Sequence, residues 1–73
     1  MNGNRSVAII PARFRSSRLP GKPLRVISGR TLIEHVYRRV EMVRGLDRVV
    51  VATDDERIES VVREFGGDVV MTR

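Results

Sequence analysis

Short runs of apolar, mostly β-branched residues alternate along this chain with segments that have a helical hydrophobic period. The runs lie at residues 7–10, 49–52 and 68–71. They lack the apolar–polar alternation of a half-exposed strand, which favours parallel strands covered on both faces. The segments between them, 31–44 and 53–65, each have one apolar face. This order of strand, helix, strand, helix, strand predicts an α/β fold, a parallel sheet with flanking helices.

The first helix is predicted to begin at Thr31 and to end before Gly45. Thr31 and Glu34 form a capping-box pattern, in which each satisfies an unpaired backbone donor. The residues that recur at helical spacing behind this box are Leu32, Val36, Val40 and Val43, with Ile33 and Tyr37 beside them. We expect these residues to form one apolar, buried face.

The second helix is predicted to follow another capping box, with Thr53 as the cap and Glu56 as its partner. Asp54 and Asp55 could instead form a metal pair or a phosphoacceptor site, but the complete box favours capping. The apolar stripe of this helix consists of Ile58, Val61, Val62 and Phe65. We expect Tyr37 of the first helix and Phe65 to be core residues, and His35 to have no catalytic role.

The length of the chain limits what it can form. It has 73 residues, no cysteine and one histidine, so disulfides, thiolate metal sites and His-cluster metal sites are excluded. A chain this short buries too little surface to be more than marginally stable, and it stops where the third strand begins. We therefore expect residues 1–73 to be an incomplete, amino-terminal part of one larger domain.

Positive charge is concentrated in the loop after the first strand. Residues 1–33 contain seven Lys or Arg and no acid, whereas residues 34–73 contain seven Arg and nine Asp or Glu. Like charges in one loop repel each other unless an anion neutralises them. Because the excess is confined to one loop, it indicates a small anionic ligand, with no nucleic acid as partner.

Residues 11–24 have the residue types of a phosphate-binding loop. Arg13 offers a planar fork for bidentate contacts, and Gly21 allows close backbone approach beside the point charge of Lys22. Ser16 and Ser17 can donate hydroxyl hydrogen bonds, and Arg18 adds charge. Pro20 and Pro23 bracket the lysine, and Pro11 is expected to end the preceding strand because it has no backbone donor.

Two common nucleotide motifs are absent. Gly21-Lys22 resembles the end of a Walker A motif, but that motif requires a glycine where Ser16 stands and Ser or Thr where Pro23 stands. The sequence also has no G-x-G-x-x-G dinucleotide fingerprint.

The loop closely resembles the signature of the 3-deoxy-manno-octulosonate (Kdo) cytidylyltransferases, or CMP-Kdo synthetases. That signature is Pro-Ala-Arg-aromatic-x-Ser-(Ser/Thr)-Arg-Leu-Pro-Gly-Lys-Pro-Leu, and residues 11–24 match it nearly throughout. The likeness continues at residues 35–37, 51–57 and 65–73, so it covers essentially the whole chain. It implies a Rossmann-like nucleotidyltransferase fold and, with magnesium as cofactor, transfer of CMP from CTP to Kdo for lipopolysaccharide synthesis.

The resemblance also implies roles for individual residues. Arg13 and Lys22 would hold the triphosphate and stabilise charge on the departing pyrophosphate. The residues near the cytosine and ribose would be Pro11, Ala12, Met71, Thr72 and Arg73. The family's Gly-Asp-Glu-Pro segment, whose carboxylate ligates magnesium, and its Kdo-binding portion have no counterpart here. We expect no metal ligand in this chain, no activity of the piece alone, and homodimers as in the family.

Several alternatives stay open. A CMP-sialic acid synthetase or another sugar nucleotidyltransferase is one, although that relative reads Lys-x-Ile-Pro-x-Lys-Asn at the loop. A non-catalytic module that binds phosphate or nucleic acid is another. Arg15 stands where the family usually has a small residue, and Phe14 could shield a base or pin the loop. Helical arginines are expected on solvated faces: Arg38, Arg39, Arg57 and Arg63. No apolar run approaches the roughly 20 residues that span a bilayer, so no membrane partner and a cytoplasmic location are expected.

Overall fold

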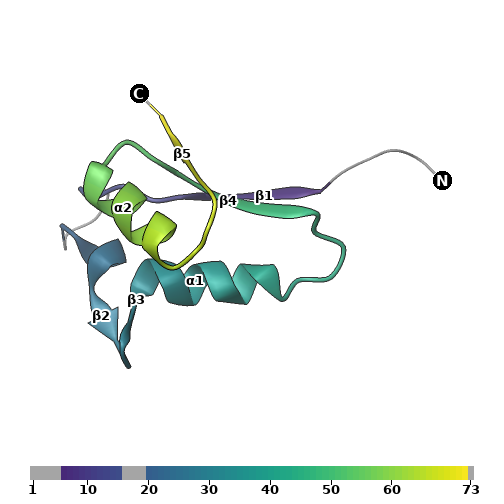
Figure 1. Ribbon diagram of the computed structural model, residues 1–73, viewed down its shortest axis with the longest axis horizontal. Helices are drawn as coiled ribbons and strands as arrows, with labels where there is room; N and C mark the ends of the chain where they lie inside the picture. Colours follow the sequence, from purple (N-terminus) through teal and green to yellow (C-terminus); the bar gives the residue numbers. More distant parts are fainter. Residues whose placement is uncertain (1–5, 16–19, 73) are drawn as a thin grey trace.

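The computed structural model describes residues 6–15 and 20–72 and has the predicted order of strands and helices (Figure 1). Its elements are β1 (Val7–Pro11), the 3-10 helix η1 (Lys22–Leu24), β2 (Val26–Ile27), β3 (Arg30–Thr31), α1 (Leu32–Glu41), β4 (Arg48–Thr53), α2 (Glu56–Glu64) and β5 (Val69–Met71). The α/β architecture predicted from the alternation is therefore confirmed.

The main sheet of the described part has the strand order β1-β4-β5, and all of its pairings are parallel. Pro11 pairs with Ala52 inside the ladder, and the next residue, Ala12, donates a backbone hydrogen bond of 2.9 Å to Ala52. β1 ends at Pro11, as expected, although Pro11 itself is still paired in the sheet. Successive residues of a strand direct their N–H groups to opposite sides; the missing donor of Pro11 therefore lies on the side away from β4.

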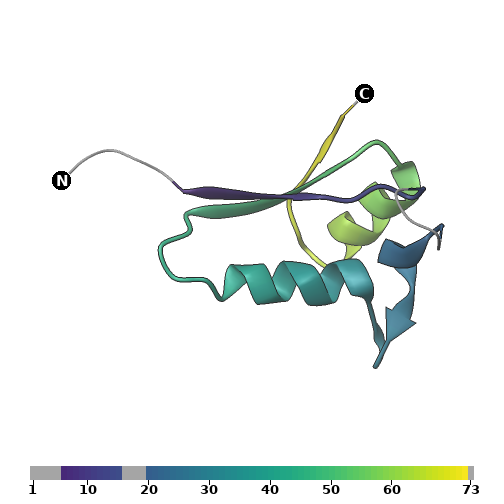
Figure 2. The ribbon, with the colours of Figure 1, turned by 180° about the vertical axis from the view of Figure 1, so that it is seen from behind.

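Both helices lie on the same face of the sheet (Figures 1 and 2). Their buried residues and those of the sheet form one core cluster, Ala12, Ile33, Tyr37, Val49, Val51, Ile58 and Val62. The predicted stripe of α2 is confirmed, with Ile58 and Val62 fully buried. The predicted face of α1 is confirmed at Ile33 and Tyr37, which are buried, and Val40 packs against the core. The prediction is wrong for Val36 and Val43, which are exposed.

The other face of the sheet is open in the described part of the chain. Val7 and Ile9 of β1 are 49 % and 63 % exposed, and Val70 of β5 is 44 % exposed. Val50 of β4 is buried on this side because strands flank it on both sides. The expectation that β1 is covered on both faces is therefore wrong for these residues, since neither helix packs there.

The caps of the two helices differ from each other. The hydroxyl of Thr31 accepts a hydrogen bond of 3.3 Å from the backbone N–H of Glu34, as predicted for α1. In α2 the predicted cap, Thr53, is still part of β4, and its hydroxyl accepts from the N–H of Asp55. The cap of α2 is Asp55, whose carboxylate accepts from the N–H groups of Arg57 and Ile58.

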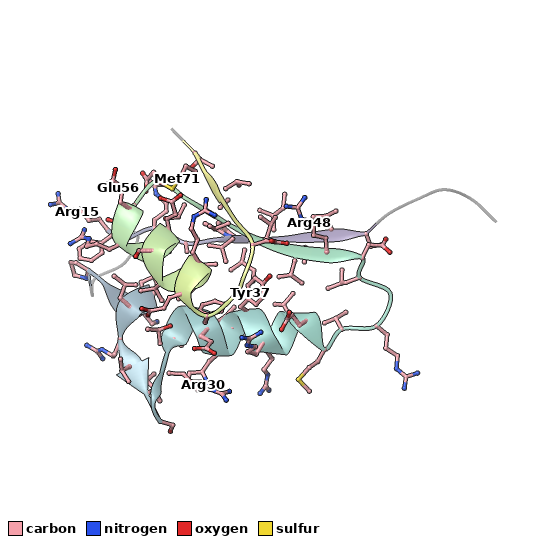
Figure 3. The ribbon with its side chains drawn as sticks, viewed as in Figure 1. Arg15, Arg30, Tyr37, Arg48, Glu56 and Met71 are labelled. Atoms are coloured by element: carbon pink, nitrogen blue, oxygen red, sulfur yellow. The ribbon has the colours of Figure 1, made fainter. Side chains whose placement is uncertain are left out.

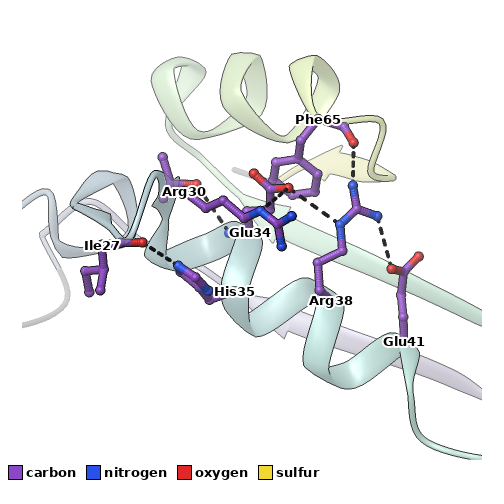
Figure 4. Close-up of polar contacts among 8 residues, drawn as sticks. Ile27, Arg30, Glu34, His35, Arg38, Glu41 and Phe65 are labelled. Carbon is purple, nitrogen blue, oxygen red and sulfur yellow. Dashed lines mark hydrogen bonds and ion pairs between the residues drawn. The ribbon is translucent and has the colours of Figure 1, made fainter.

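A short hairpin, β2–β3, packs beside the start of α1 (Figure 1). Its turn at 28–29 has positive φ angles of 53° and 83°, a geometry that suits a two-residue hairpin turn. His35 donates from Nε2 to the carbonyl of Ile27 at 2.6 Å, which ties the hairpin to α1 (Figure 4). The single histidine thus has a structural partner.

Ion pairs along α1 connect the hairpin with the end of α2 (Figure 4). Glu34 pairs with Arg30 at 3.9 Å and with Arg38 at 3.6 Å. Arg38 also pairs with Glu41 and donates a 2.8 Å hydrogen bond to the carbonyl of Phe65. Arg38 therefore bridges the two helices and does more than face solvent.

Candidate functional site

The basic loop leaves the carboxyl end of β1 and is closed at its base by the backbone. Ala12 is buried and Arg13 is exposed. The N–H of Gly21 donates a 2.8 Å hydrogen bond to the carbonyl of Phe14, so the two ends of the loop are joined directly. The predictions for Ser16, Ser17 and Arg18 lie outside the described residues, as does that for Arg73.

The ends of the three parallel strands meet at one hollow. It has a volume of about 370 Å³ and is lined by Pro11, Arg13, Ala52, Thr53, Asp54 and Thr72. The N–H of Thr72 donates to the carbonyl of Thr53 at 2.8 Å, which brings the ends of β4 and β5 together. Met71, also a predicted site residue, pairs with Thr53 in the sheet and is half-exposed. The structure thus places segments far apart in the sequence at the edge where open parallel sheets bind ligands.

A second hollow brings together the two cations that were predicted to hold phosphate. It has a volume of about 250 Å³, and Arg13 and Lys22 line it together with Ile10, Pro11, Ala12, Pro23, Leu32, Ile33 and Val36. Gly21, with a φ of 80°, turns the chain directly before Lys22, and the 3-10 helix η1 fixes the residues that follow. Arg13 lines both hollows. A polyanion that reaches from one to the other would therefore pass its guanidinium.

A third hollow beside the loop has mixed charge. It is lined by Arg13, Phe14, Arg15, Asp54, Asp55 and Arg57. Arg15 and the first residue of α2, Glu56, lie at the same end of the molecule (Figure 3). Asp54 lines this hollow and the hollow between the strand ends, so it faces the basic loop and takes no part in the cap of α2.

Arg57 was not singled out by the sequence, which indicated only a solvated helix face. The structure places its guanidinium carbon 3.6 Å from the centroid of the Phe14 ring. Its Nη2 and Nε atoms donate to the two oxygens of Asp55 at 2.7 and 3.2 Å. This hydrogen bond lowers the pKa of the Asp55 carboxyl and raises the pKa of Arg57. The contact between Arg57 and Phe14 joins positions distant in the sequence, and no local pattern predicts it.

The described part of the chain contains no cluster of typical metal-ligating side chains. Among residues 6–15 and 20–72, no group of three or more His, Cys, Asp or Glu side chains could hold a metal ion. Magnesium commonly binds through one or two carboxylates together with substrate phosphates. Asp54 is the carboxylate that lines the hollow between the strand ends, whereas Asp55 is engaged in the cap of α2.

None of the described helices has both the length and the apolar character needed to cross a bilayer.

The chain is similar to known proteins over nearly its whole length. A protein-family model described as cytidylyltransferase matches residues 7–73, nearly the whole chain. The chain belongs to the cytidylyltransferase family. This cytidylyltransferase chain is 57 % identical over 72 residues to the 3-deoxy-manno-octulosonate cytidylyltransferase of Myxococcus xanthus, which covers 99 % of the chain and 29 % of that relative.

Other relatives show the same partial coverage. An 8-amino-3,8-dideoxy-manno-octulosonate cytidylyltransferase of Shewanella frigidimarina is 58 % identical over 64 residues, 88 % of this chain and 26 % of the relative. A solved structure of CMP:2-keto-3-deoxy-manno-octonic acid synthetase complexed with CTP superimposes with a TM-score of 0.91 at 54 % identity, covering 96 % of this chain and 29 % of that one. The cytidylyltransferase chain therefore spans less than a third of the length of these relatives.

Proposed function

We propose that this chain forms the amino-terminal, CTP-binding part of a cytidylyltransferase that transfers CMP to Kdo and releases pyrophosphate. The observation that carries the proposal is the convergence of Arg13 and Lys22 on one hollow at the carboxyl end of β1, in a chain of the cytidylyltransferase family. A relative with the same fold was solved with CTP bound.

In the proposed reaction a hydroxyl oxygen of the acceptor sugar attacks the α-phosphorus of CTP and releases its proton to solvent. The bond between that phosphorus and the bridging oxygen to the β-phosphate breaks, and pyrophosphate leaves with the electron pair. Negative charge grows on the leaving oxygens, and cations held in place before the reaction stabilise it more in the transition state than in the ground state. Arg13 suits bidentate contact with the phosphate oxygens, and Lys22 supplies a compact charge from the adjacent side of the hollow.

Magnesium is proposed to accompany CTP in the complete enzyme. The carboxylate that the family resemblance assigns to it belongs to the Gly-Asp-Glu-Pro segment, which has no counterpart in this sequence. The roles given to Arg13 and Lys22 do not depend on it. The isolated chain is proposed to bind the nucleotide weakly and to be inactive.

The acceptor is proposed to be Kdo on the strength of the loop signature and of relatives such as the Myxococcus xanthus enzyme. Relatives named for the 8-amino sugar are equally similar, at 58–59 % identity. The residues of this chain therefore do not separate the two acceptors. Pyrophosphate release by the full-length enzyme with each sugar would decide between them.

The nucleotide site is testable on the chain itself. Titration of CTP, followed by calorimetry or by amide NMR shifts, should give measurable binding that Arg13→Gln and Lys22→Gln each weaken about tenfold, since each loses a charge-assisted hydrogen bond. Arg44→Gln removes the same charge from the α1–β4 connection at the opposite end of the molecule (Figure 1). It should leave the affinity nearly unchanged.

Two results would count against this function. Equal losses of CTP affinity in the loop variants and in Arg44→Gln would show that only net charge attracts CTP. Binding of single-stranded RNA in preference to CTP, with affinity falling steeply as salt rises, would favour a nucleic-acid module instead.

A further inference from the structure

The aromatic ring at the base of the phosphate loop is held from α2 by a cation. The guanidinium carbon of Arg57 lies 3.6 Å from the centroid of the Phe14 ring, well inside the roughly 6 Å at which such contacts are attractive. The same ring lies close to the other end of the loop, because a Cβ atom on Gly21 would come within 3.1 Å of it. Phe14 therefore contacts both Gly21 and α2.

Arg57 is itself fixed by the cap of its helix. Its Nη2 and Nε atoms donate hydrogen bonds to the carboxylate of Asp55, at 2.7 and 3.2 Å. That carboxylate also accepts from the backbone N–H groups of Arg57 and Ile58, and the Asp55 side chain is only 13 % exposed. Since Ile58 is fully buried, the cap, the guanidinium and the ring are connected to the core of the fold.

The consequence reaches the two proposed phosphate ligands. Phe14 directly follows Arg13, and its carbonyl accepts the hydrogen bond from Gly21, the residue before Lys22. A shift of Phe14 would therefore move both cations that line the shared hollow. Ligand sites gain affinity when their groups are held in the bound arrangement before the ligand arrives.

We propose that Arg57 is a positioning residue for the nucleotide site: it holds Phe14 against α2 and thereby keeps Arg13 and Lys22 at the spacing that a triphosphate requires. The inference rests on the proposed function for its ligand, CTP, but the placement of the loop can be measured without any ligand. Arg57 contacts the loop through Phe14, and its proposed role requires no direct contact with CTP.

The test compares Arg57→Ala with Arg63→Ala in the chain of 73 residues. Arg63 lies on the same helix, is similarly exposed and pairs with Glu59 at 3.0 Å, so both variants lose one charge and one ion pair. The first readout is hydrogen exchange of the Gly21 N–H without ligand, with the Val51 N–H, bonded to Asp68 in the sheet, as a monitor of the whole fold. The second is affinity for CTP.

We expect Arg57→Ala to speed Gly21 exchange and to weaken CTP binding, each by about three- to tenfold, the size of an aromatic–cation contact. Val51 exchange should stay unchanged, and Arg63→Ala should match the wild type in both readouts. Phe14→Leu removes the aromatic ring, the other half of the contact, and should reproduce the effect. If Arg57→Ala does not fold, Phe14→Leu takes its place in the test. Arg57→Lys, which keeps the charge but lacks the flat fork, should fall between.

The proposal is overturned if Gly21 exchange in Arg57→Ala equals that in Arg63→Ala. It is also overturned if CTP binding weakens without a change in Gly21 exchange, since Arg57 would then touch the ligand directly, or if Arg57→Lys behaves as the wild type. If the wild-type chain fails to bind CTP, the proposed function fails for this chain, whereas the exchange comparison still decides whether Arg57 holds the loop.

Discussion

The hydroxyl of Tyr37 donates a 3.1 Å hydrogen bond to the carbonyl of Val49 and so joins the middle of α1 to the central strand of the described sheet (Figure 3). The same oxygen accepts a 3.0 Å hydrogen bond from the N–H of Asp68, just before β5. The hydroxyl of this buried side chain thus satisfies two backbone groups, one from a segment before α2 in the sequence and one from a segment after it.

Replacing Tyr37 by Phe should destabilise the fold although the ring is kept. The variant leaves a buried carbonyl at Val49 and an N–H at Asp68 without their partner, at a cost of about 1–3 kcal/mol. The edge contact of the ring with Phe65, at 5.3 Å between centroids, should persist. The urea midpoint measures the loss, and a midpoint equal to that of the wild type would show that water replaces the hydroxyl at no cost.

The same substitution on the two predicted helix stripes should give different results. Val62 is fully buried in the core and Val43 is 55 % exposed. Val62→Ala should cost about 2 kcal/mol or more because it leaves a cavity, enough to unfold much of a small chain, whereas Val43→Ala should stay within about 0.5 kcal/mol. Thermal unfolding followed by circular dichroism compares them. Similar losses at both positions would contradict the observed face of α1.

Stability should depend on the ionisation of Asp55 in acid. The hydrogen bond from the Arg57 guanidinium, with those from the backbone of Ile58 and Arg57, holds the pKa of this carboxyl below its usual value. A lowered folded-state pKa means that the charge stabilises the fold above the unfolded value of about 3.9. That contribution disappears as the pH falls through the lower folded value.

The variant Asp55→Asn tests this dependence because it cannot ionise. At pH about 6 the wild type should melt at a higher temperature than the variant, and the difference should shrink as the pH is lowered to about 2. Melting curves at a series of pH values give this difference directly. A gap that stays constant over the range would show that the charge of Asp55 adds nothing to its role as a cap.

Gly67 should not tolerate a side chain, for steric reasons. A Cβ atom there would lie 2.7 Å from the Phe65 ring, 2.9 Å from Val62 and 3.2 Å from Tyr37. Gly67→Ala should therefore cost about 1–3 kcal/mol through overpacking. The combination with Phe65→Leu, which removes the nearest atom, should recover part of the loss in the urea midpoint. If the single variant is as stable as the wild type, the turn after α2 is looser than described.

Local pattern was sufficient to predict the order of elements but not every packing face. The apolar runs identify β1, β4 and β5, and the stripe of α2 is unambiguous because its neighbours are charged. In α1, two adjacent stripes are both apolar, and which one is buried depends on the position of the sheet. Tyr37 was expected in the core, but the hydrogen bonds that its hydroxyl makes with Val49 and Asp68 cannot be predicted from periodicity.

For the site, too, local sequence patterns predict one part and leave another part unpredicted. The composition of residues 11–24 predicts a phosphate loop, and the parallel topology predicts that the strand ends meet. The contact between Arg57 and Phe14 follows from neither, because it joins a helix to a loop far away in the sequence. The cap of α2 was placed two residues too early, since β4 continues through Thr53 and leaves Asp55 as the first free acceptor.

The hydrogen bond between Gly21 and Phe14 fixes the separation of the described ends of the basic loop. An anion that binds between Arg13 and Lys22 therefore meets two cations whose neighbouring residues are already joined by the backbone. Arg15, the departure from the family signature, takes no part in that hydrogen bond and lines the third hollow. A substitution of Arg15 should therefore change the charge beside the site and leave the spacing of Arg13 and Lys22 as it is.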